Sequence, residues 1–307
     1  MAQIVGLVAL SHSPFWDLSF DVSGPGSEFV RGVESARNLI AEQEPDALVI
    51  FGPDHFRNFF YDVLPPFCIG VEKITGFGDY GSPKGAIPSA EALGREIHAA
   101  VSGQDFDPAF SLNMGVDHGI SQPYAALDQG RKTPVVAVMV NAGGAPRPSF
   151  RRCYDFGRAV GDAIRASSNA GRVMILGSGG LSHWVAPVSE DNPQTPADIR
   201  DYVINGRERV VEYSAKRDAS LAARKSEAVD GKVNPEWDRW FLDTLASGDM
   251  EPLLSMDSDE VERLAGNGAH EVRAWLSAIG AWGGGVEVMA YEPVPQWVTG
   301  MGCIAGR

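Results

Sequence analysis

The chain has 307 residues, 44% of them apolar, which fits one large α/β domain or two fused halves with a substantial core. That apolar share is ordinary for a globular protein and argues against a disordered chain. The net charge is −14, whereas nucleic-acid-binding proteins usually present a basic face, so we expect no nucleic-acid partner.

The cysteines and the apolar segments bear on where the protein works. Cys68, Cys153 and Cys303 lie far apart with no C-x-x-C pair, which predicts reduced thiols and a cytoplasmic protein. The apolar N-terminal segment lacks a basic start, so we interpret it as a buried strand and not as a signal peptide. No apolar stretch approaches the roughly 20 residues that span a bilayer, so we expect no membrane partner.

The first fifty residues predict a strand, a helix and a second strand. Residues 4–10 and 47–51 are short apolar runs rich in β-branched residues, typical of buried strands. Residues 28–43 have apolar side chains at helical spacing. A strand, helix and strand in this order predict a βαβ unit with a parallel pair of strands.

The middle of the chain alternates between predicted loops, helices and strands. Residues 56–88 are rich in Phe, Pro and Gly, and we predict a long aromatic loop with weak regular structure. Loops of this length usually act as lids or binding walls. Later patterns predict helices over 89–101 and 150–167 and strands over 135–140 and 172–176.

After about residue 190 the pattern is mostly helical. Predicted helix starts are Thr195, Asn234 and Asp257. A further helix over 269–280 places Glu271 on its first turn. We predict an α/β protein with one catalytic domain over residues 1–307, a central and mostly parallel sheet flanked by helices, and a helical C-terminal third.

Four of the six histidines lie in short loops: His12, His55, His118 and His183. His12 and His55 each follow a predicted strand, and loops at the carboxyl ends of strands line one crevice in an open α/β sheet. Imidazole is the commonest protein metal ligand and a natural proton shuttle. The pattern predicts a metal-centred active site with histidines to spare for acid–base work. For each histidine taken alone, the alternative is a structural role, in which its ring only makes hydrogen bonds within a loop.

A facial triad of two histidines and one carboxylate suits non-haem Fe(II) oxygen chemistry. His12 and His55 are the imidazole candidates. Glu271 is the carboxylate candidate, barely favoured by spacing over Glu287 or Glu292. His270 adjoins Glu271, but neighbouring helical residues point about 100° apart, so both can hardly bind one ion.

Two other kinds of site fit the sequence less well. The segment Gly177-Ser-Gly-Gly180 lacks the lysine and spacing of a phosphate-binding loop. Ser13, Ser178 and Ser182 lie near histidines, but no G-x-S-x-G elbow is present.

Several segments resemble, in the same order, motifs of the class III (LigB-type) extradiol ring-cleaving dioxygenases, closest to the branch that acts on 2,3-dihydroxyphenylpropionate (3-carboxyethylcatechol). The segments are Leu10-Ser-His-Ser-Pro14, Gly52-Pro-Asp-His55, Phe59-Phe-Tyr-Asp-Val-Leu-Pro-Pro-Phe-Cys68, Val116-Asp-His-Gly119, Gly177-Ser-Gly-Gly-Leu-Ser-His183 and His270-Glu271. The resemblance covers nearly the whole chain.

The resemblance implies a role for each matched residue. His12, His55 and Glu271 match the family's Fe(II) ligands, and His118 and His183 match its acid–base pair. We assign the base to His183 and the acid to His118. The implied substrates are O₂ and a catechol-type ring that undergoes meta-cleavage.

The chain departs from the branch after His55, where Arg57 and Asn58 stand, and after His183, where Trp184 begins a different segment. We expect Arg57, Phe59 and Trp184 to line the substrate pocket, with Arg57 facing an acidic substituent; an exposed loop position is the alternative for Arg57.

Some alternatives stay open from the sequence. The same chemistry could act on gallate-like or protocatechuate-like rings or on dihydroxypyridines. A zinc-dependent ring-opening enzyme or hydrolase is another reading, because zinc accepts the same ligands. A non-catalytic relative would be expected to lose part of the five-residue set. We also expect a homo-oligomer.

Overall fold

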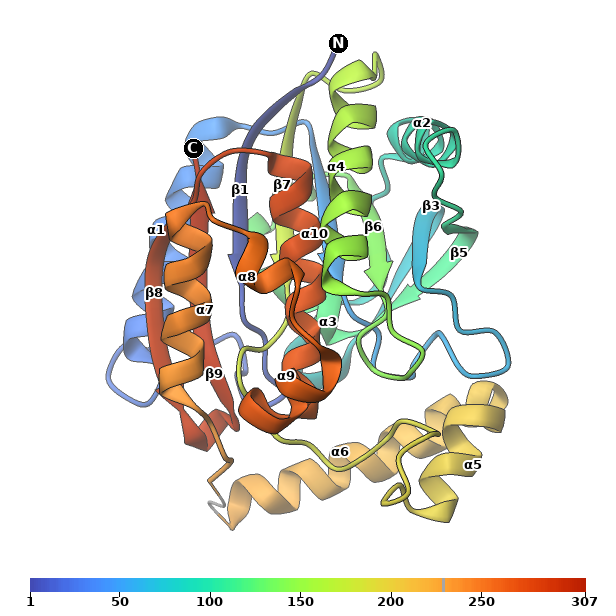
Figure 1. The fold of residues 1–307 in the computed structure, drawn as a ribbon, viewed down its shortest axis with the longest axis vertical. Helices are drawn as coiled ribbons and strands as arrows, with labels where there is room; N and C mark the ends of the chain where they lie inside the picture. The colour runs from blue at the N-terminus through green and yellow to red at the C-terminus, as the bar shows by residue number, and fades with distance from the viewer. Residues whose placement is uncertain (228–229) are drawn as a thin grey trace.

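A computed structural model describes residues 1–227 and 230–307, and its centre is one nine-stranded sheet with helices on both faces (Figure 1). The strands are β1 (Gln3–Leu10), β2 (Ala47–Gly52), β3 (Phe67–Phe77), β4 (Lys84–Ile87), β5 (Ala109–Val116), β6 (Val135–Val140), β7 (Arg172–Ser178), β8 (Glu287–Val294) and β9 (Thr299–Gly306).

The strand order is β4-β3-β6-β2-β7-β1-β9-β8, with β5 beside β3. The four central strands β6, β2, β7 and β1 are parallel. Antiparallel pairing of β3 with β6 and of β9 with β1 extends the sheet at both ends. The predicted α/β class is confirmed, and the sheet is mixed. The two strands of the expected βαβ unit are parallel but not neighbours, because β7 lies between them.

The helices of the described residues are α1 (Ser27–Gln43), α2 (Glu91–Ser102), α3 (His118–Asp128), α4 (Phe150–Ala166), α5 (Ala197–Asn205), α6 (Val210–Ser226), α7 (Pro235–Ser247), α8 (Glu251–Leu254), α9 (Ser258–Ala265) and α10 (Val272–Trp282). Short 3₁₀ turns are η1 (Asp79–Gly81), η2 (Gly206–Arg209), η3 (Asn267–Glu271) and η4 (Pro295–Trp297). Among these described residues, no helix has the length and apolar character to cross a membrane.

The central strands are buried on both faces, because helices cover each side. Val49 and Phe51 of β2 point into the core shared with α4 and α10, whereas Leu48 and Ile50 point into the core shared with α1 and α3. This alternation is the period of two expected of a strand, with apolar residues on both sides. The runs over 47–51 and 135–140 therefore lack polar alternation.

Helices α5 and α6 lie across the end of the sheet toward which β1 points (Figure 1). The Tyr202 hydroxyl donates to the carbonyl of Phe56, and the Arg217 guanidinium donates to the carbonyl of His55 at 3.0 Å. These bonds attach the two helices to the loop that follows β2.

Three expectations differ from the structure. The segment 56–88 is not mainly loop, because it contains β3, η1 and β4. Thr195 does not cap α5: its hydroxyl donates to the carbonyl of Ser189, and Pro196 stands at the cap position. The C-terminal third is helical only to Trp282, after which β8 and β9 form an antiparallel pair that completes the sheet.

Candidate metal centre

Two histidines and one glutamate meet at the carboxyl ends of the central strands. His12 follows β1, His55 follows β2, and Glu271 ends η3 just before α10. The Nε2 atom of His12 lies 3.3 Å from Glu271 Oε2, and the Nε2 atom of His55 lies 3.0 Å from Glu271 Oε1. His12 and Glu271 are buried, and the His55 side chain is 17% exposed.

The outward nitrogen of each ring has its own partner. His12 Nδ1 lies 2.9 Å from the hydroxyl oxygen of Ser178, at the end of β7. His55 Nδ1 lies 3.0 Å from Asp117 Oδ2, which also accepts the backbone N–H of His55 at 2.7 Å. Such partners fix a ligating ring's orientation and tautomer and leave the inner nitrogen for an ion. Asp117 therefore holds His55 and not its sequence neighbour His118.

Close backbone packing fixes Glu271. The N–H of Gly180 donates to Glu271 Oε2 at 2.6 Å. A Cβ at Gly179, whose φ is 145°, would collide with the backbone and side chain of Glu271. The glycines after β7 thus allow the loop to approach the carboxylate, where the sequence suggested an approach to a ligand.

His118 and His183 complete the cluster from two further elements. The His118 ring stacks on His55 with ring centroids 4.2 Å apart, and its Nδ1 lies 2.7 Å from Asp79 Oδ2. His183 Nδ1 donates to the carbonyl of Leu181 at 2.8 Å, and its Nε2 lies 3.8 Å from Glu271 Oε1. The structure therefore brings all five predicted residues to one place.

Burial and charge act differently on the groups of this cluster. Burial lowers the pKa of His12 to about 3, so this imidazole is neutral near pH 7. Burial also opposes charge on His55, but Asp117 and Glu271 outweigh it and raise its pKa to about 10. Against their own burial, the pKa values of Glu271 and Asp117 lie well below the usual range because of the nearby histidines. Both carboxylates are therefore ionised.

The donor set fits a divalent metal ion. Ligand atoms held about 2.0–2.2 Å from one ion lie roughly 3–3.5 Å apart when the bonds meet near 90–110°. The separations of 3.3 Å and 3.0 Å from the Glu271 oxygens to the two Nε2 atoms fall in that range. His12, His55 and His118 also have ligand atoms within 4.8 Å of one another. The His118 stack on His55 places it beside the set.

A second group, Asp79, Asp117 and His118, has ligand atoms equally close together. Its oxygens are already engaged, because Asp117 binds His55 and Asp79 binds His118. We therefore interpret these aspartates as partners of the histidines and not as a separate ion site.

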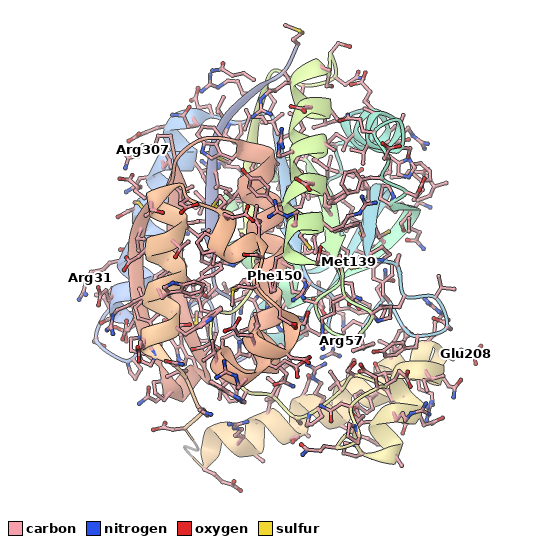
Figure 2. The ribbon with its side chains drawn as sticks, in the orientation of Figure 1. Arg31, Arg57, Met139, Phe150, Glu208 and Arg307 are labelled. Atoms are coloured by element: carbon pink, nitrogen blue, oxygen red, sulfur yellow. The ribbon has the colours of Figure 1, made fainter. Side chains whose placement is uncertain are left out.

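The three predicted pocket residues differ in their burial and contacts. Arg57 is buried, so the alternative of an exposed loop residue is wrong; Figure 2 shows it where the sheet meets α5 and α6. Its Nη2 atom contacts the Tyr80 hydroxyl at 3.3 Å and Asp218 of α6 at 3.4 Å. Phe59 is partly buried, and Trp184 packs under the Lys232 ammonium at 3.9 Å. His270 turns away and bonds Glu262 and Arg273.

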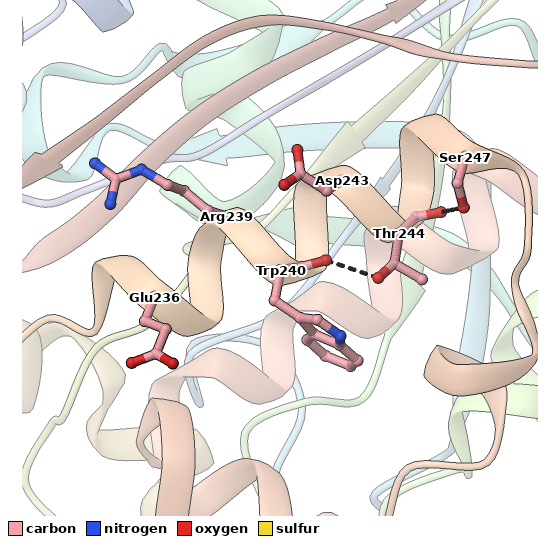
Figure 3. A pocket seen from close by; sticks show the side chains of 6 residues that line it. All are labelled: Glu236, Arg239, Trp240, Asp243, Thr244 and Ser247. Carbon is pink, nitrogen blue, oxygen red and sulfur yellow. Dashed lines mark hydrogen bonds between the residues drawn. The ribbon is translucent and has the colours of Figure 1, made fainter.

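One hollow of about 570 Å³ lies elsewhere, along α7 (Figure 3). Its lining residues all come from that helix, and the Thr244 and Ser247 hydroxyls donate to carbonyls of the same helix. No histidine is among the described residues that line it.

Sequence reasoning missed some residues that support the cluster. The sequence suggests Ser178 only as a nucleophile, and it does not single out Asp79, which lies in the segment 56–88 that is rich in Phe, Pro and Gly. Ser182 is also not poised as a nucleophile, because it binds Asp238 through both its N–H and its hydroxyl.

Comparison with known proteins decides the family. A family model described as the catalytic LigB subunit of aromatic ring-opening dioxygenase matches residues 6–302. The chain belongs to the LigB family. It is 35% identical over 312 residues to the 2,3-dihydroxyphenylpropionate/2,3-dihydroxicinnamic acid 1,2-dioxygenase of Klebsiella pneumoniae, covering 97% of each chain. The protein of that name in Cupriavidus necator is 36% identical over 310 residues, with 96% of each chain covered.

The fold is found among solved structures too. The crystal structure of uncharacterized protein JW3007 from Escherichia coli K12 matches with a TM-score of 0.52 and 13% identity, covering 98% of this LigB chain and 99% of that one. At this identity the match speaks to the fold alone. The predicted class is confirmed: the protein is an extradiol ring-cleaving dioxygenase, which implies a catalytic metal, an aromatic substrate and O₂.

Proposed function

We propose that the protein is a non-haem Fe(II) extradiol dioxygenase that cleaves a 3-substituted catechol such as 2,3-dihydroxyphenylpropionate. The observation that carries the proposal is the convergence of His12, His55 and Glu271, with His118 and His183 beside them. Two imidazoles and one carboxylate leave open coordination positions, as non-haem Fe(II) oxygen chemistry requires. The relatives named for this substrate support the choice of catechol.

His12, His55 and Glu271 would hold the iron. When bound, iron supplies Lewis acidity toward the catechol hydroxyls and the redox chemistry that activates O₂. The chain itself keeps these ligands in place through Ser178 and Asp117. In the segment after His55, Phe56 and Phe60 pack against Tyr202 and Val203 of α5. Phe59 and Trp184 would wall the ring and limit access of bulk water.

The neighbours of His183 favour the role of base. Because the carbonyl of Leu181 can only accept, the proton of the neutral ring lies on Nδ1. The Nε2 lone pair then faces the centre, 3.8 Å from Glu271 Oε1, where it can take a proton from a catechol hydroxyl.

The neighbours of His118 favour the role of acid. Its Nδ1 faces the Asp79 carboxylate, which stabilises a protonated imidazole as a buried aspartate does beside a catalytic histidine. The Nε2 proton of that imidazolium would be the one donated during ring cleavage. The two histidines therefore differ by their outer partners and not by their own chemistry.

Arg57 is the proposed partner of a substrate carboxylate. It is buried, its Nε atom has no hydrogen-bond partner among the described residues, and its contact with Asp218 is a long one to a side chain that is 47% exposed. A substrate carboxylate could displace Asp218 and bind the guanidinium in a bidentate manner. Replacing Arg57 with Ala should raise KM for the carboxylated catechol and leave KM for unsubstituted catechol unchanged; equal KM changes for both would remove the idea.

We also propose that residues 1–307 act as one catalytic domain, that the enzyme is a homo-oligomer, and that it works in the cytoplasm. Support for one domain is the pairing of β1 with β9, which joins both ends of the chain in one sheet. Support for a reducing compartment is that Cys68, Cys153 and Cys303 are buried and unpaired. Gel filtration with light scattering tests the oligomeric state.

The test is anaerobic reconstitution with Fe(II), then addition of 2,3-dihydroxyphenylpropionate in air, with O₂ uptake and yellow product followed together. Stoichiometric O₂ loss with a yellow product is the expected result. Activity only on other catechols, gallates or dihydroxypyridines would keep the reaction and change the substrate. Turnover by zinc-loaded protein without O₂ uptake would favour the zinc alternative.

A further inference from the structure

A tight turn between β3 and β4 is built against His118. Asp79 Oδ2 lies 2.7 Å from His118 Nδ1, and the Tyr80 ring meets the His118 ring edge to face with centroids 4.9 Å apart. Both contacts come from η1, a turn of only three residues. Two adjacent side chains of this turn therefore define the position of one imidazole.

The turn holds these two side chains against His118 in an unfavourable backbone conformation. Gly78 and Gly81 have φ values of 76° and 79°, and Tyr80 between them has a φ of 50°. A non-glycine residue in this left-handed region is strained and persists only where its surroundings impose it. Such strain gathers at functional sites, and here the strained turn directs Asp79 and Tyr80 onto a histidine of the centre.

Asp79 is buried, and its remaining contacts hold the carboxylate in place. The Ser82 hydroxyl donates to Oδ1 at 3.2 Å, and the Arg57 guanidinium lies 3.9 Å from Oδ2. His118 and Arg57 together outweigh burial and lower the pKa of this carboxyl, so it is ionised and can only accept. The His118 proton opposite Oδ2 must therefore lie on Nδ1.

We propose that Asp79 is a positioning residue of the dioxygenase reaction, which fixes the tautomer and orientation of His118 so that Nε2 faces the substrate. The inference rests on the proposed acid role of His118 and extends it to a residue 39 positions away in the chain. It assigns the strained turn a purpose that the histidine motifs alone do not reveal.

The expected effect follows from removing the negative acceptor. The side-chain amide of an asparagine at this position can turn its NH₂ toward Nδ1 and impose the opposite tautomer. At a catalytic histidine, the wrong tautomer lowers kcat by about 10⁴-fold. Loss of one acid–base group lowers the rate by about 10²–10⁴-fold. Asp79→Asn should therefore lower kcat at least about 10²-fold. Iron content should stay near the parental value, because Asp79 does not touch the ligand set. KM for unsubstituted catechol, which has no carboxylate to bind Arg57, should also stay near the parental value.

The experiment compares Asp79→Asn, Asp79→Glu and Asp128→Asn in the iron-loaded enzyme. Asp128 is also a buried carboxylate, but it accepts backbone N–H groups of Lys132 and Thr133, so its variant controls for loss of a buried aspartate. We expect a large kcat loss in Asp79→Asn, a smaller loss in Asp79→Glu and no loss in Asp128→Asn. A kcat within threefold of the parent in Asp79→Asn, or loss of bound iron from it, would overturn the proposal.

A second readout does not depend on activity. In protein labelled with ¹⁵N-histidine and loaded with zinc, the His118 signals, assigned through their loss in His118→Phe, should show the proton on Nδ1. The Asp79→Asn variant should change that pattern. If the parent cleaves no catechol, the proposed function fails while this spectrum still decides whether Asp79 sets the tautomer; a proton on Nε2 alone in the parent would refute the inference.

Discussion

Replacing Ser178 with Ala should weaken metal binding without removing a ligand. The Ser178 hydroxyl is the only described hydrogen-bond partner of His12 Nδ1, at 2.9 Å, and both groups are buried. The variant leaves the Nδ1 proton without an acceptor and frees the ring to rotate, so the Nε2 lone pair no longer points reliably at the ion.

The magnitude follows from this single bond. A buried neutral hydrogen bond contributes about 0.5–1.5 kcal/mol, and a buried donor left unsatisfied costs about 1–3 kcal/mol. At about 1.4 kcal/mol per factor of ten, the metal Kd should rise roughly 10–100-fold, the range seen when outer partners of metal ligands are removed.

Anaerobic competition between the protein and an Fe(II) chelator measures this Kd. Ser277→Ala is the matched control, because Ser277 is also fully buried and its hydroxyl donates to the carbonyls of Cys153 and Arg273, neither of which belongs to the metal centre. The reasoning is refuted if Ser178→Ala keeps the parental Kd within threefold while its thermal unfolding shows a folded protein.

Three further outcomes are expected. His12→Ala and Glu271→Ala should each lose bound iron in metal analysis, and retention of stoichiometric iron by either would show that the ligand assignment is wrong. His183→Ala should keep its iron while kcat falls about 10²–10⁴-fold in the O₂-uptake assay; an unchanged kcat would exclude it as the base. Burial raises the pKa of the Asp238 carboxyl from 3.8 to about 6, so the folded protein binds the carboxyl proton more tightly than the unfolded chain does. The stability that this proton contributes is fully present well below pH 3.8 and is lost as the pH rises through 6. Urea unfolding of Asp238→Asn and the parent should therefore show their stability difference moving by about 2 kcal/mol in the variant's favour between pH 4 and pH 7, and a constant difference would contradict the shift.

The central strands were predictable because burial on both faces leaves an uninterrupted apolar run. The run over 135–140 coincides with β6, and the helix-start signals at Asn234 and Asp257 correspond to side chains that cap α7 and α9. Local sequence decides such features, so a single segment is enough to find them.

The outer strands were missed because their residues depend on tertiary partners. β3 contains Gly70 and Gly76 with charged residues between them, which hides its period. β9 is wholly buried although it contains Gly300 and Gly302, because it pairs with β1 on one side and β8 on the other. β5 did carry a usable signal, since its apolar residues alternate from Phe110 to Val116.

The four histidines of the centre were predictable from their loops and Glu271 from the family resemblance, but the group that holds each histidine ring was not. Each histidine makes its outer contact with a residue remote in sequence or with a backbone group: Ser178, Asp117, Asp79 or the Leu181 carbonyl. Sequence spacing indicates where a histidine lies in the fold, but it does not indicate which group binds the second ring nitrogen.

The partners of the outer ring nitrogens explain how four identical side chains can take different chemical roles. A neutral hydroxyl beside His12 favours a neutral ligand, and a carboxylate beside His55 makes its ring a stronger donor to a metal. A carbonyl beside His183 leaves a free lone pair, whereas a carboxylate beside His118 stabilises a proton to be given away. The reacting ring is the same in every case. The partner of its second nitrogen should therefore decide the role of each histidine.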